Sequence, residues 1–193
     1  MKIAACRTLL CAQIAATAVP APEFTPLGKS AGEVLGMAQA YANDGTMFYQ
    51  SGDLVNALAS YFYGSGWLHF GYAAGLLVLV APVTPSCPFQ DAGELLPAAS
   101  GAQLEEKTRR YARLLDTARA SVVTAPEPAT VTHEFAGQVE VIVSAYAAQG
   151  RRFLDRESRE DALACFSYGY GWLDAGVRTG LFRITGDRDI FTV

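Results

Sequence analysis

A single spacing of 105 residues relates the two halves of this 193-residue chain, and it restricts the fold more than any other feature. The densest match sets Tyr63-Gly64-Ser65-Gly66-Trp67-Leu68 against Tyr168-Gly169-Tyr170-Gly171-Trp172-Leu173. At the same spacing, and without a gap, Ala57-Leu58-Ala59 matches Ala162-Leu163-Ala164. Self-similarity of this kind indicates that one structural unit occurs twice along the chain.

Each half has the pattern of three helices joined by proline-containing connections. Prolines occur within residues 20–26, 82–97 and 126–128 and nowhere else, and proline interrupts helix interiors. In the second half, apolar residues recur at helical spacing in three stripes, and strand-like alternation is absent. Helix starts are predicted by capping patterns at Ser30-x-x-Glu33, Ser100-x-x-Gln103 and Ser158-x-x-Asp161, and by Thr132 as a further N-cap.

These patterns predict an all-α fold, in which two tandem three-helix units pack into a helical bundle with pseudo-two-fold symmetry. We expect a first repeat over residues 1–81, a Pro-rich linker over 82–102 and a second repeat over 103–193. A duplicated chain can be a covalent version of a homodimer, whose copies are related by a two-fold axis. Copies packed head to tail would contradict this prediction.

Two apolar segments imitate export or membrane signals. Residues 1–22 combine Lys2, an apolar run and a possible cleavage site at Ala16-Thr17-Ala18, as a signal peptide does. Residues 54–90 contain no Asp, Glu, Lys or Arg and are long enough to cross a bilayer. The counterpart of that segment carries charges that a bilayer would penalise, namely Asp161, Asp174, Arg178 and Arg183. We therefore expect helices of a cytoplasmic protein without a membrane-spanning segment, and a cleaved signal peptide is the alternative for the N-terminus.

Composition argues against several classes of function. The net charge of −4 does not suit a nucleic-acid-binding protein, which neutralises phosphates with Lys and Arg. Residues 1–100 hold only three basic side chains, Lys2, Arg7 and Lys29, so this half is either well buried or part of an oligomer interface. The histidines, His69 and His133, and the cysteines show no metal-ligand spacing. We expect no metal, no cofactor and reduced thiols at Cys6, Cys11, Cys87 and Cys165.

The segment Glu160-Asp161-Ala162-Leu163-Ala164, followed by Ser167-Tyr168-Gly169-Tyr170-Gly171-Trp172-Leu173-Asp174-Ala175-Gly176, resembles the archaeal domain of unknown function 357 family. Residues 104–184 look like one complete copy, and residues 1–79 look like a diverged second copy. The resemblance implies a small helical bundle in an archaeal cytoplasm. It implies no reaction.

Both halves contain a glycine-rich helix. Its glycines lower the stability of the helix, because glycine in a helix interior is about 1 kcal/mol less favourable than alanine. The structural interpretation is close helix packing in both repeats, by Tyr63, Gly64, Trp67, Gly71, Gly75, Gly169, Gly176 and Gly180. The functional interpretation is a ligand cleft in the second repeat, formed by Tyr168, Trp172, Asp174 and Arg178. A further alternative is that Asp174 and Arg178, four residues apart, form an exposed helix ion pair.

The chain contains no P-loop, no dinucleotide-binding motif after a strand, no H-E-x-x-H and no G-x-S-x-G. We therefore favour a non-enzymatic protein-interaction or assembly module, with a homo-oligomer or another protein as its partner. The alternative is a small-molecule-binding protein or unrecognised enzyme that uses the Tyr/Trp/Asp cleft. A role in binding RNA is a remote third hypothesis, since it does not suit the net charge.

Overall fold

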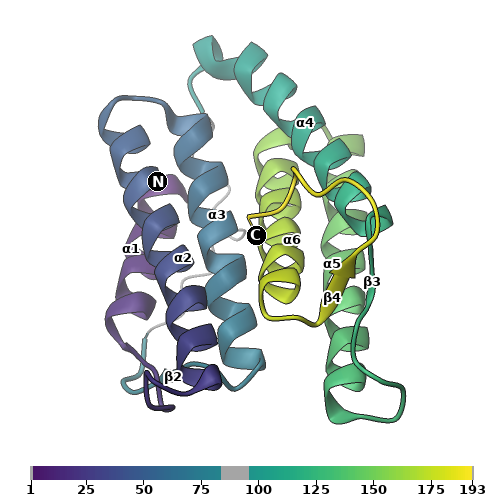
Figure 1. Cartoon of the computed structure of the whole chain (residues 1–193). Coiled ribbons are helices and arrows are strands. Elements are labelled where there is room, and N and C mark those ends of the chain that lie inside the picture. The colour runs from purple at the N-terminus through teal and green to yellow at the C-terminus, as the bar shows by residue number, and fades with distance from the viewer. Residues whose placement is uncertain (1, 84–95, 193) are drawn as a thin grey trace.

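The structure is a computed structural model that describes residues 2–83 and 96–192, and helices dominate it (Figure 1). The first repeat contains α1 (Lys2–Ala15), α2 (Pro26–Gln50) and α3 (Leu54–Ala73). The second contains a short 3-10 turn (Ala98–Ser100), α4 (Gly101–Ala120), α5 (Val131–Asp155) and α6 (Arg159–Arg178). Both α2 and α3 begin and end 105 residues before α5 and α6, so the sequence repeat is also a structural repeat. The predicted all-α fold is confirmed.

Each repeat also has a short antiparallel ribbon that the sequence analysis did not predict. In the first, β1 (Thr17–Ala18) pairs with β2 (Val78–Leu79), and in the second, β3 (Val122–Thr124) pairs with β4 (Phe182–Ile184). The two registers are equivalent, because Thr17 lies opposite Leu79 and Val122 lies opposite Ile184. Strands of two or three residues are too short for alternation to become visible in a sequence.

Helices α3 and α6 lie at the centre of the molecule and cross closely. The crossing point is formed by Gly66 and Gly171, which occupy equivalent positions in the two repeats. A Cβ atom on Gly66 would clash with the carbonyl oxygen of Tyr168, and a Cβ atom on Gly171 would clash with that of Tyr63. The lack of a side chain at both positions therefore sets how closely the two backbones approach.

The contacts between α3 and α6 are reciprocal, as pseudo-two-fold symmetry requires. Gly66 meets the backbone of Tyr168, while Gly171 meets the backbone of Tyr63, the residue equivalent to Tyr168. Head-to-tail packing would instead bring different surfaces of the two repeats together. The structure thus has the symmetric arrangement that the sequence repeat predicted.

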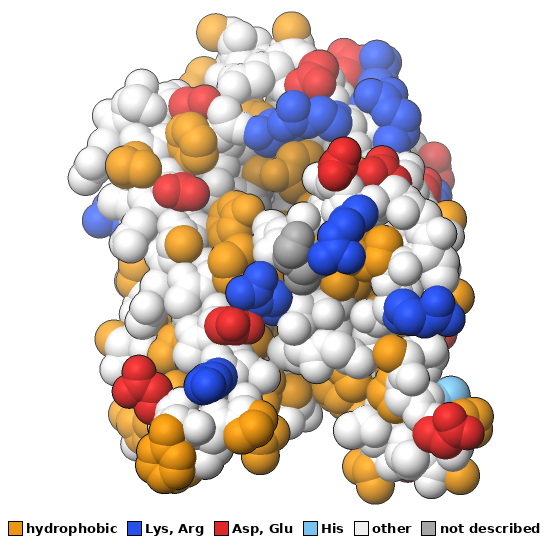
Figure 2. Space-filling view, viewed as in Figure 1, with side chains coloured by type: hydrophobic (Ala, Val, Ile, Leu, Met, Phe, Trp, Pro, Cys, Tyr) orange, Lys and Arg blue, Asp and Glu red, His pale blue; other side chains and the backbone are white. Residues whose placement is uncertain are grey.

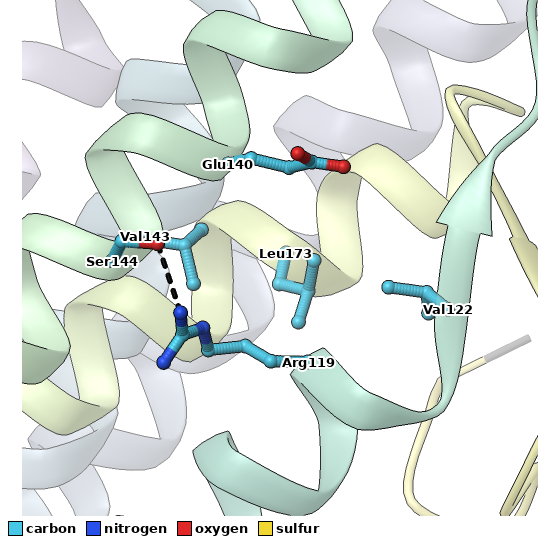
Figure 3. Close-up of a pocket in the computed structure, with 6 residues that line it drawn as sticks. All are labelled: Arg119, Val122, Glu140, Val143, Ser144 and Leu173. Atoms are coloured by element: carbon cyan, nitrogen blue, oxygen red, sulfur yellow. Dashed lines mark hydrogen bonds between the residues drawn. The ribbon is translucent and has the colours of Figure 1, made fainter.

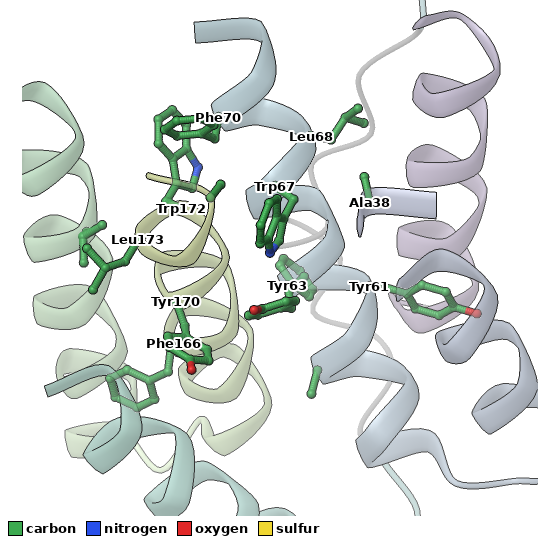
Figure 4. Packing of buried hydrophobic residues seen from close by; sticks show 14 of the residues in the cluster. Ala38, Tyr61, Tyr63, Trp67, Leu68, Phe70, Phe166, Tyr170, Trp172 and Leu173 are labelled. Carbon is green, nitrogen blue, oxygen red and sulfur yellow. The ribbon is translucent and has the colours of Figure 1, made fainter. Parts of the chain in front are cut away.

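Buried side chains of both repeats form one continuous core. Figure 4 shows Tyr63 between α3 and α6, whereas Tyr61 points to the other side of α3, where it packs on Gly45 of α2. Phe166 of α6 packs on Gly150 of α5 in the equivalent way. Because α3 is covered on both sides, its lack of charged residues reflects burial in protein. Within the described residues, no helix is long and apolar enough to cross a membrane.

Some helix boundaries differ from the capping predictions. Thr25 caps α2 by accepting a hydrogen bond from the Gly28 amide at 3.0 Å, so Ser30 lies inside the helix. Thr130 caps α5 in the same way for the His133 amide at 3.1 Å, and Thr132 lies inside that helix. Thr25 and Thr130 both have the extended backbone that an N-cap requires. Residues 84–95 of the expected linker, with Cys87, lie outside the described residues.

Candidate functional site

Two tyrosines at equivalent positions reach across the α3–α6 interface to different partners. Tyr63 of α3 donates a hydrogen bond to the Oδ2 atom of Asp174 on α6. The hydroxyl of Tyr168 on α6 lies 2.9 Å from Nδ1 of His69 on α3. Since Asp174 and His69 are equivalent in the repeat, the interface carries one phenol–carboxyl pair and one phenol–imidazole pair at symmetric places.

The Asp174 carboxyl is fully buried and also holds the C-terminal segment. Its Oδ1 accepts from the Thr192 amide at 3.1 Å, and its Oδ2 accepts from the Thr192 hydroxyl at 2.8 Å. Burial raises the pKa of Asp174, although the hydrogen bonds from Tyr63 and Thr192 and the charge of Arg178 act in the opposite direction. Asp174 therefore anchors the end of the chain to the centre of the molecule.

The imidazole of His69 is enclosed between α1 and α6. Its Nδ1 faces the Tyr168 hydroxyl, and its Nε2 lies 3.4 Å from Oε1 of Gln13. Burial lowers the pKa of His69 and favours the neutral ring. A neutral ring has one acceptor and one donor nitrogen, which suits a phenol O–H on one side and an amide oxygen on the other.

Further tyrosines surround these pairs. The ring of Tyr41 packs 4.3 Å from that of Tyr63, and the ring of Tyr146 packs 4.3 Å from that of Tyr168. Burial raises the pKa of Tyr63, Tyr168 and Tyr170, and the nearby charge of Asp174 adds to the increase for Tyr63 and Tyr170. These phenols keep their protons at neutral pH, so they act as hydrogen-bonding and packing groups.

Of the four residues that the sequence suggested as a ligand cleft, Tyr168 and Trp172 are ring neighbours with centroids 6.3 Å apart, and each of the four has further partners. Tyr168 contacts His69, and Asp174 contacts Tyr63. The Trp172 ring meets Phe70 with centroids 5.9 Å apart. The indole nitrogens of Trp67 and Trp172 have no hydrogen-bond partner among the described residues.

The exposed Asp174–Arg178 ion pair was a wrong interpretation. Asp174 is buried against α3, whereas Arg178 lies at the exposed end of α6 and pairs with Glu33 of α2 at 3.0 Å. Arg178 also donates to the Thr192 carbonyl at 3.2 Å. The i, i+4 spacing allowed contact, but Asp174 accepts hydrogen bonds from Tyr63 and Thr192, whereas Arg178 pairs with Glu33.

The glycines assigned to helix packing fall into two groups. Gly64 and Gly169 lie against Tyr41 and Tyr146, while Gly71 and Gly176 lie against Leu77 and Phe182. Gly75 and Gly180 correct the prediction, because both follow the ends of their helices with φ of +68° and +81° and would have no neighbour within 4 Å of an added Cβ. Their function is to end the helix in a left-handed conformation.

The polar side chains at this interface bond mainly to one another. In the part of the chain that the structure describes, no group of three or more His, Cys, Asp or Glu side chains could hold a metal ion. The polar atoms of Tyr63, Asp174, His69 and Tyr168 are satisfied by one another and by neighbouring residues. They hold the two repeats in register and fasten the C-terminus.

Exposed apolar residues lie at the end of the first repeat where α2 begins beside the β1–β2 ribbon. We call its five exposed apolar residues the apolar tip, and Figure 2 shows hydrophobic side chains gathered at this lower end of the molecule. Phe24 is 84% exposed and Val80 is 66% exposed. The tip consists of Phe24, Leu27, Val78, Leu79 and Val80.

Two stretches, residues 8–77 and 110–182, match the model of a family described as a protein of unknown function (DUF357). The chain belongs to this family. Each stretch covers most of one repeat, so the protein contains two DUF357 units in tandem. No curated protein and no solved structure matches it.

The two DUF357 units differ at the tip, and the sequence analysis missed this difference. Positions equivalent to Phe24, Leu27, Val78, Leu79 and Val80 carry Ala129, Thr132, Arg183, Ile184 and Thr185 in the second unit. Comparing the halves at the 105-residue spacing would have revealed that Leu27, Val78 and Val80 correspond to the polar residues Thr132, Arg183 and Thr185. The contacts of Thr192 and Glu33 left no such signal, because they depend on the packing of distant segments.

Proposed function

We propose that the protein is a non-enzymatic assembly module that binds a second copy of itself through the apolar tip. The observation that supports this proposal is the difference between the two units at the tip. Because the second unit folds with Thr132, Arg183 and Thr185 at equivalent positions, the fold does not require apolar residues there. Large apolar side chains exposed at one end of a molecule can mark an interaction surface.

Charge complementarity favours a second copy as the partner. Glu23 and Lys29, both exposed, flank Phe24 and Leu27 in the sequence. In a two-fold dimer the same surface meets itself, so Glu23 of one copy can face Lys29 of the other. The second unit has Pro128 and Glu134 at these positions and lacks this pair of opposite charges.

The β1–β2 ribbon provides the backbone for the same contact. In the described residues this sheet contains two strands only, so no strand among them pairs with the outer edge of β2. Edges of this kind pair readily with a strand from another chain. Two β2 strands related by a two-fold axis would form a four-stranded sheet across the dimer, with Val78 and Leu79 at its centre.

The test is to give the tip the residues of the second unit. A variant with Phe24→Ala, Leu27→Thr, Val78→Arg and Val80→Thr should fold, because each new residue occurs at the equivalent place in the second unit. Sedimentation equilibrium over a concentration series should report a dimer for the wild type and a monomer for the variant.

The matched control is Val131→Thr, which removes an apolar side chain that is 82% exposed on the second unit. This control should still dimerise. A wild type that stays monomeric at every concentration, or a tip variant that dimerises as strongly as the wild type, would refute the proposal.

A further inference from the structure

A cavity of about 230 Å³ lies in the second unit, where the end of α4, β3, α5 and α6 meet. Figure 3 shows Arg119 extending toward Ser144, with Glu140 on the same helix as Ser144 and Leu173 behind them. The walls of the cavity combine apolar and polar side chains. They are Arg119, Val122, Glu140, Val143, Ser144 and Leu173.

The first unit does not have the same lining. Ile14 and Leu35 occupy the positions of Arg119 and Glu140, and both pack against the hydrophobic core. The position of Leu173 is Leu68 in the first unit, so the apolar floor is retained. The second unit therefore has two opposite charges around an apolar floor where the first has aliphatic side chains.

We propose that this cavity binds a small zwitterion with an aliphatic body, the class to which leucine-like α-amino acids belong. Arg119 donates from Nη2 to Ser144 Oγ at 2.9 Å, so a carboxylate placed there can receive hydrogen bonds from both side chains. Guanidinium groups bind carboxylates strongly because their donors form a planar fork.

Glu140 supplies the opposite end of the site. Its Oε1 accepts from the Thr124 hydroxyl at 3.0 Å, which positions the carboxylate beside β3 and leaves acceptor capacity for an ammonium group. Glu140 and Ser144 are four residues apart on α5, and such side chains are about 5–6 Å apart at their Cβ atoms. A molecule whose charges are separated by a few bonds can therefore contact both ends.

The size of the cavity and its floor restrict the rest of the ligand. Pockets for drug-sized molecules usually exceed about 300 Å³, so the 230 Å³ available here suits a smaller molecule. Val122, with the core residues Val143 and Leu173, forms the apolar wall against which a branched aliphatic side chain would pack. The Arg119 side chain is 37% exposed, so the ligand can enter from solvent at this rim.

The experiment titrates L-leucine into the ¹⁵N-labelled full chain and follows amide shifts by NMR. We expect saturable shifts at residues 119–124, 140–144 and 173. Two probes that each lack one charge, 4-methylpentanoate and 3-methylbutylamine, should bind about tenfold or more weakly, because each loses a charge-assisted contact.

The decisive variant carries Arg119→Ile and Glu140→Leu, the residues that the first unit has at these positions. It should fold and lose binding of leucine. The control carries Glu105→Leu and Arg109→Ile, which remove an exposed ion pair elsewhere on α4, and it should bind leucine as the wild type does. Absence of saturable shifts in the wild type, equal binding of all three probes, or binding retained by the Arg119/Glu140 variant would overturn the proposal.

Discussion

The two units of this protein share a fold and differ in where they place charge. Both keep the glycine at the α3–α6 crossing, the tyrosine that reaches across it and the tryptophan one turn later. The first unit has an apolar tip and an aliphatic wall at Ile14 and Leu35, whereas the second has polar residues at three of the five tip positions and a cavity with Arg119 and Glu140. Features that both units share are those the fold needs, and features that differ are candidates for function.

The largest expected effect concerns the shared crossing. Gly66→Ala and Gly171→Ala should each lower the free energy of unfolding by about 3 kcal/mol, because each new methyl group meets a backbone carbonyl that cannot move alone. Urea denaturation would measure both variants. Their costs should be equal, since the two positions are related by the pseudo-two-fold axis.

The control for the crossing is Gly137→Ala on α5, where an added Cβ has no neighbour within 4 Å. This change should raise stability by about 0.5–1 kcal/mol, because alanine favours the helix more than glycine does. A large difference between the Gly66 and Gly171 variants would break the symmetric description of the interface.

The second expected effect compares the non-equivalent partners of the two tyrosines. Asp174→Ala should destabilise the protein by about 2–3 kcal/mol, because it leaves the buried hydroxyl of Tyr63 and the part-buried amide and hydroxyl of Thr192 without their acceptor. His69→Ala should cost less, since among the described residues the His69 imidazole has hydrogen-bonding contacts with Tyr168 and Gln13, and the Gln13 contact is long at 3.4 Å. Thermal and urea unfolding would rank the two, and an equal cost would contradict the assignment of Asp174 as the C-terminal anchor.

Sequence alone could predict much of the fold and little of this polar interface. The spacing of 105 residues, which relates Trp67 to Trp172, predicted the repeat and its symmetry. The positions of the prolines and the helical periodicity predicted the helices. The interpretation of Asp174 and Arg178 failed because an i, i+4 spacing does not say which side of a helix is buried. Thr192, the partner of Asp174, approaches from 18 residues further along the chain, and no local pattern predicts such a contact.

The apolar tip and the cavity show in the same way what the sequence can and cannot predict. The apolar tip is visible in the sequence once Leu27 is compared with Thr132 and Val78 with Arg183. The cavity is not visible in the sequence, because it depends on how α4, β3, α5 and α6 pack against one another. Comparing the sequences of the repeats shows which positions differ. Only the structure shows which residues of other elements lie next to those positions.

The third expected effect is a pH dependence of opposite sign in the two pairs. Burial raises the pKa of Asp174 above the ordinary 3.8, so its contribution to stability is complete below that pH and is lost as pH rises through the folded-state value. Burial lowers the pKa of His69 below the ordinary 6.5, so its contribution is complete above that pH and is lost as pH falls through the folded-state value.

Unfolding measured from about pH 4 to about pH 8 would separate the two groups, at about 1.4 kcal/mol for each unit of pKa difference. Asp174→Asn should remove the decline on the alkaline side of pH 3.8, and His69→Gln should remove the decline on the acid side of pH 6.5. Unchanged pH profiles in both variants would show that neither group titrates differently on folding.

The smallest expected effect concerns a link that exists once in the molecule. Arg178 pairs with Glu33, whereas the equivalent positions hold Ala73 and Gln138. Both side chains are more than one third exposed, and exposed ion pairs contribute about 0.2–1 kcal/mol. A double-mutant cycle with Arg178→Ala and Glu33→Gln should give a coupling in this range that decreases with salt. A coupling energy of zero at low salt would show that this ion pair does not stabilise the protein.

The most direct test of the central claim, that the first unit binds through its tip and the second does not, is hydrogen exchange at two protein concentrations. Amides of residues 76–81 should exchange more slowly in the concentrated sample, because β2 becomes paired in the dimer, while amides of residues 181–186 should exchange at the same rate in both. If the two ribbons respond equally, or if neither responds while the protein stays folded, the difference at the tip does not create a binding surface.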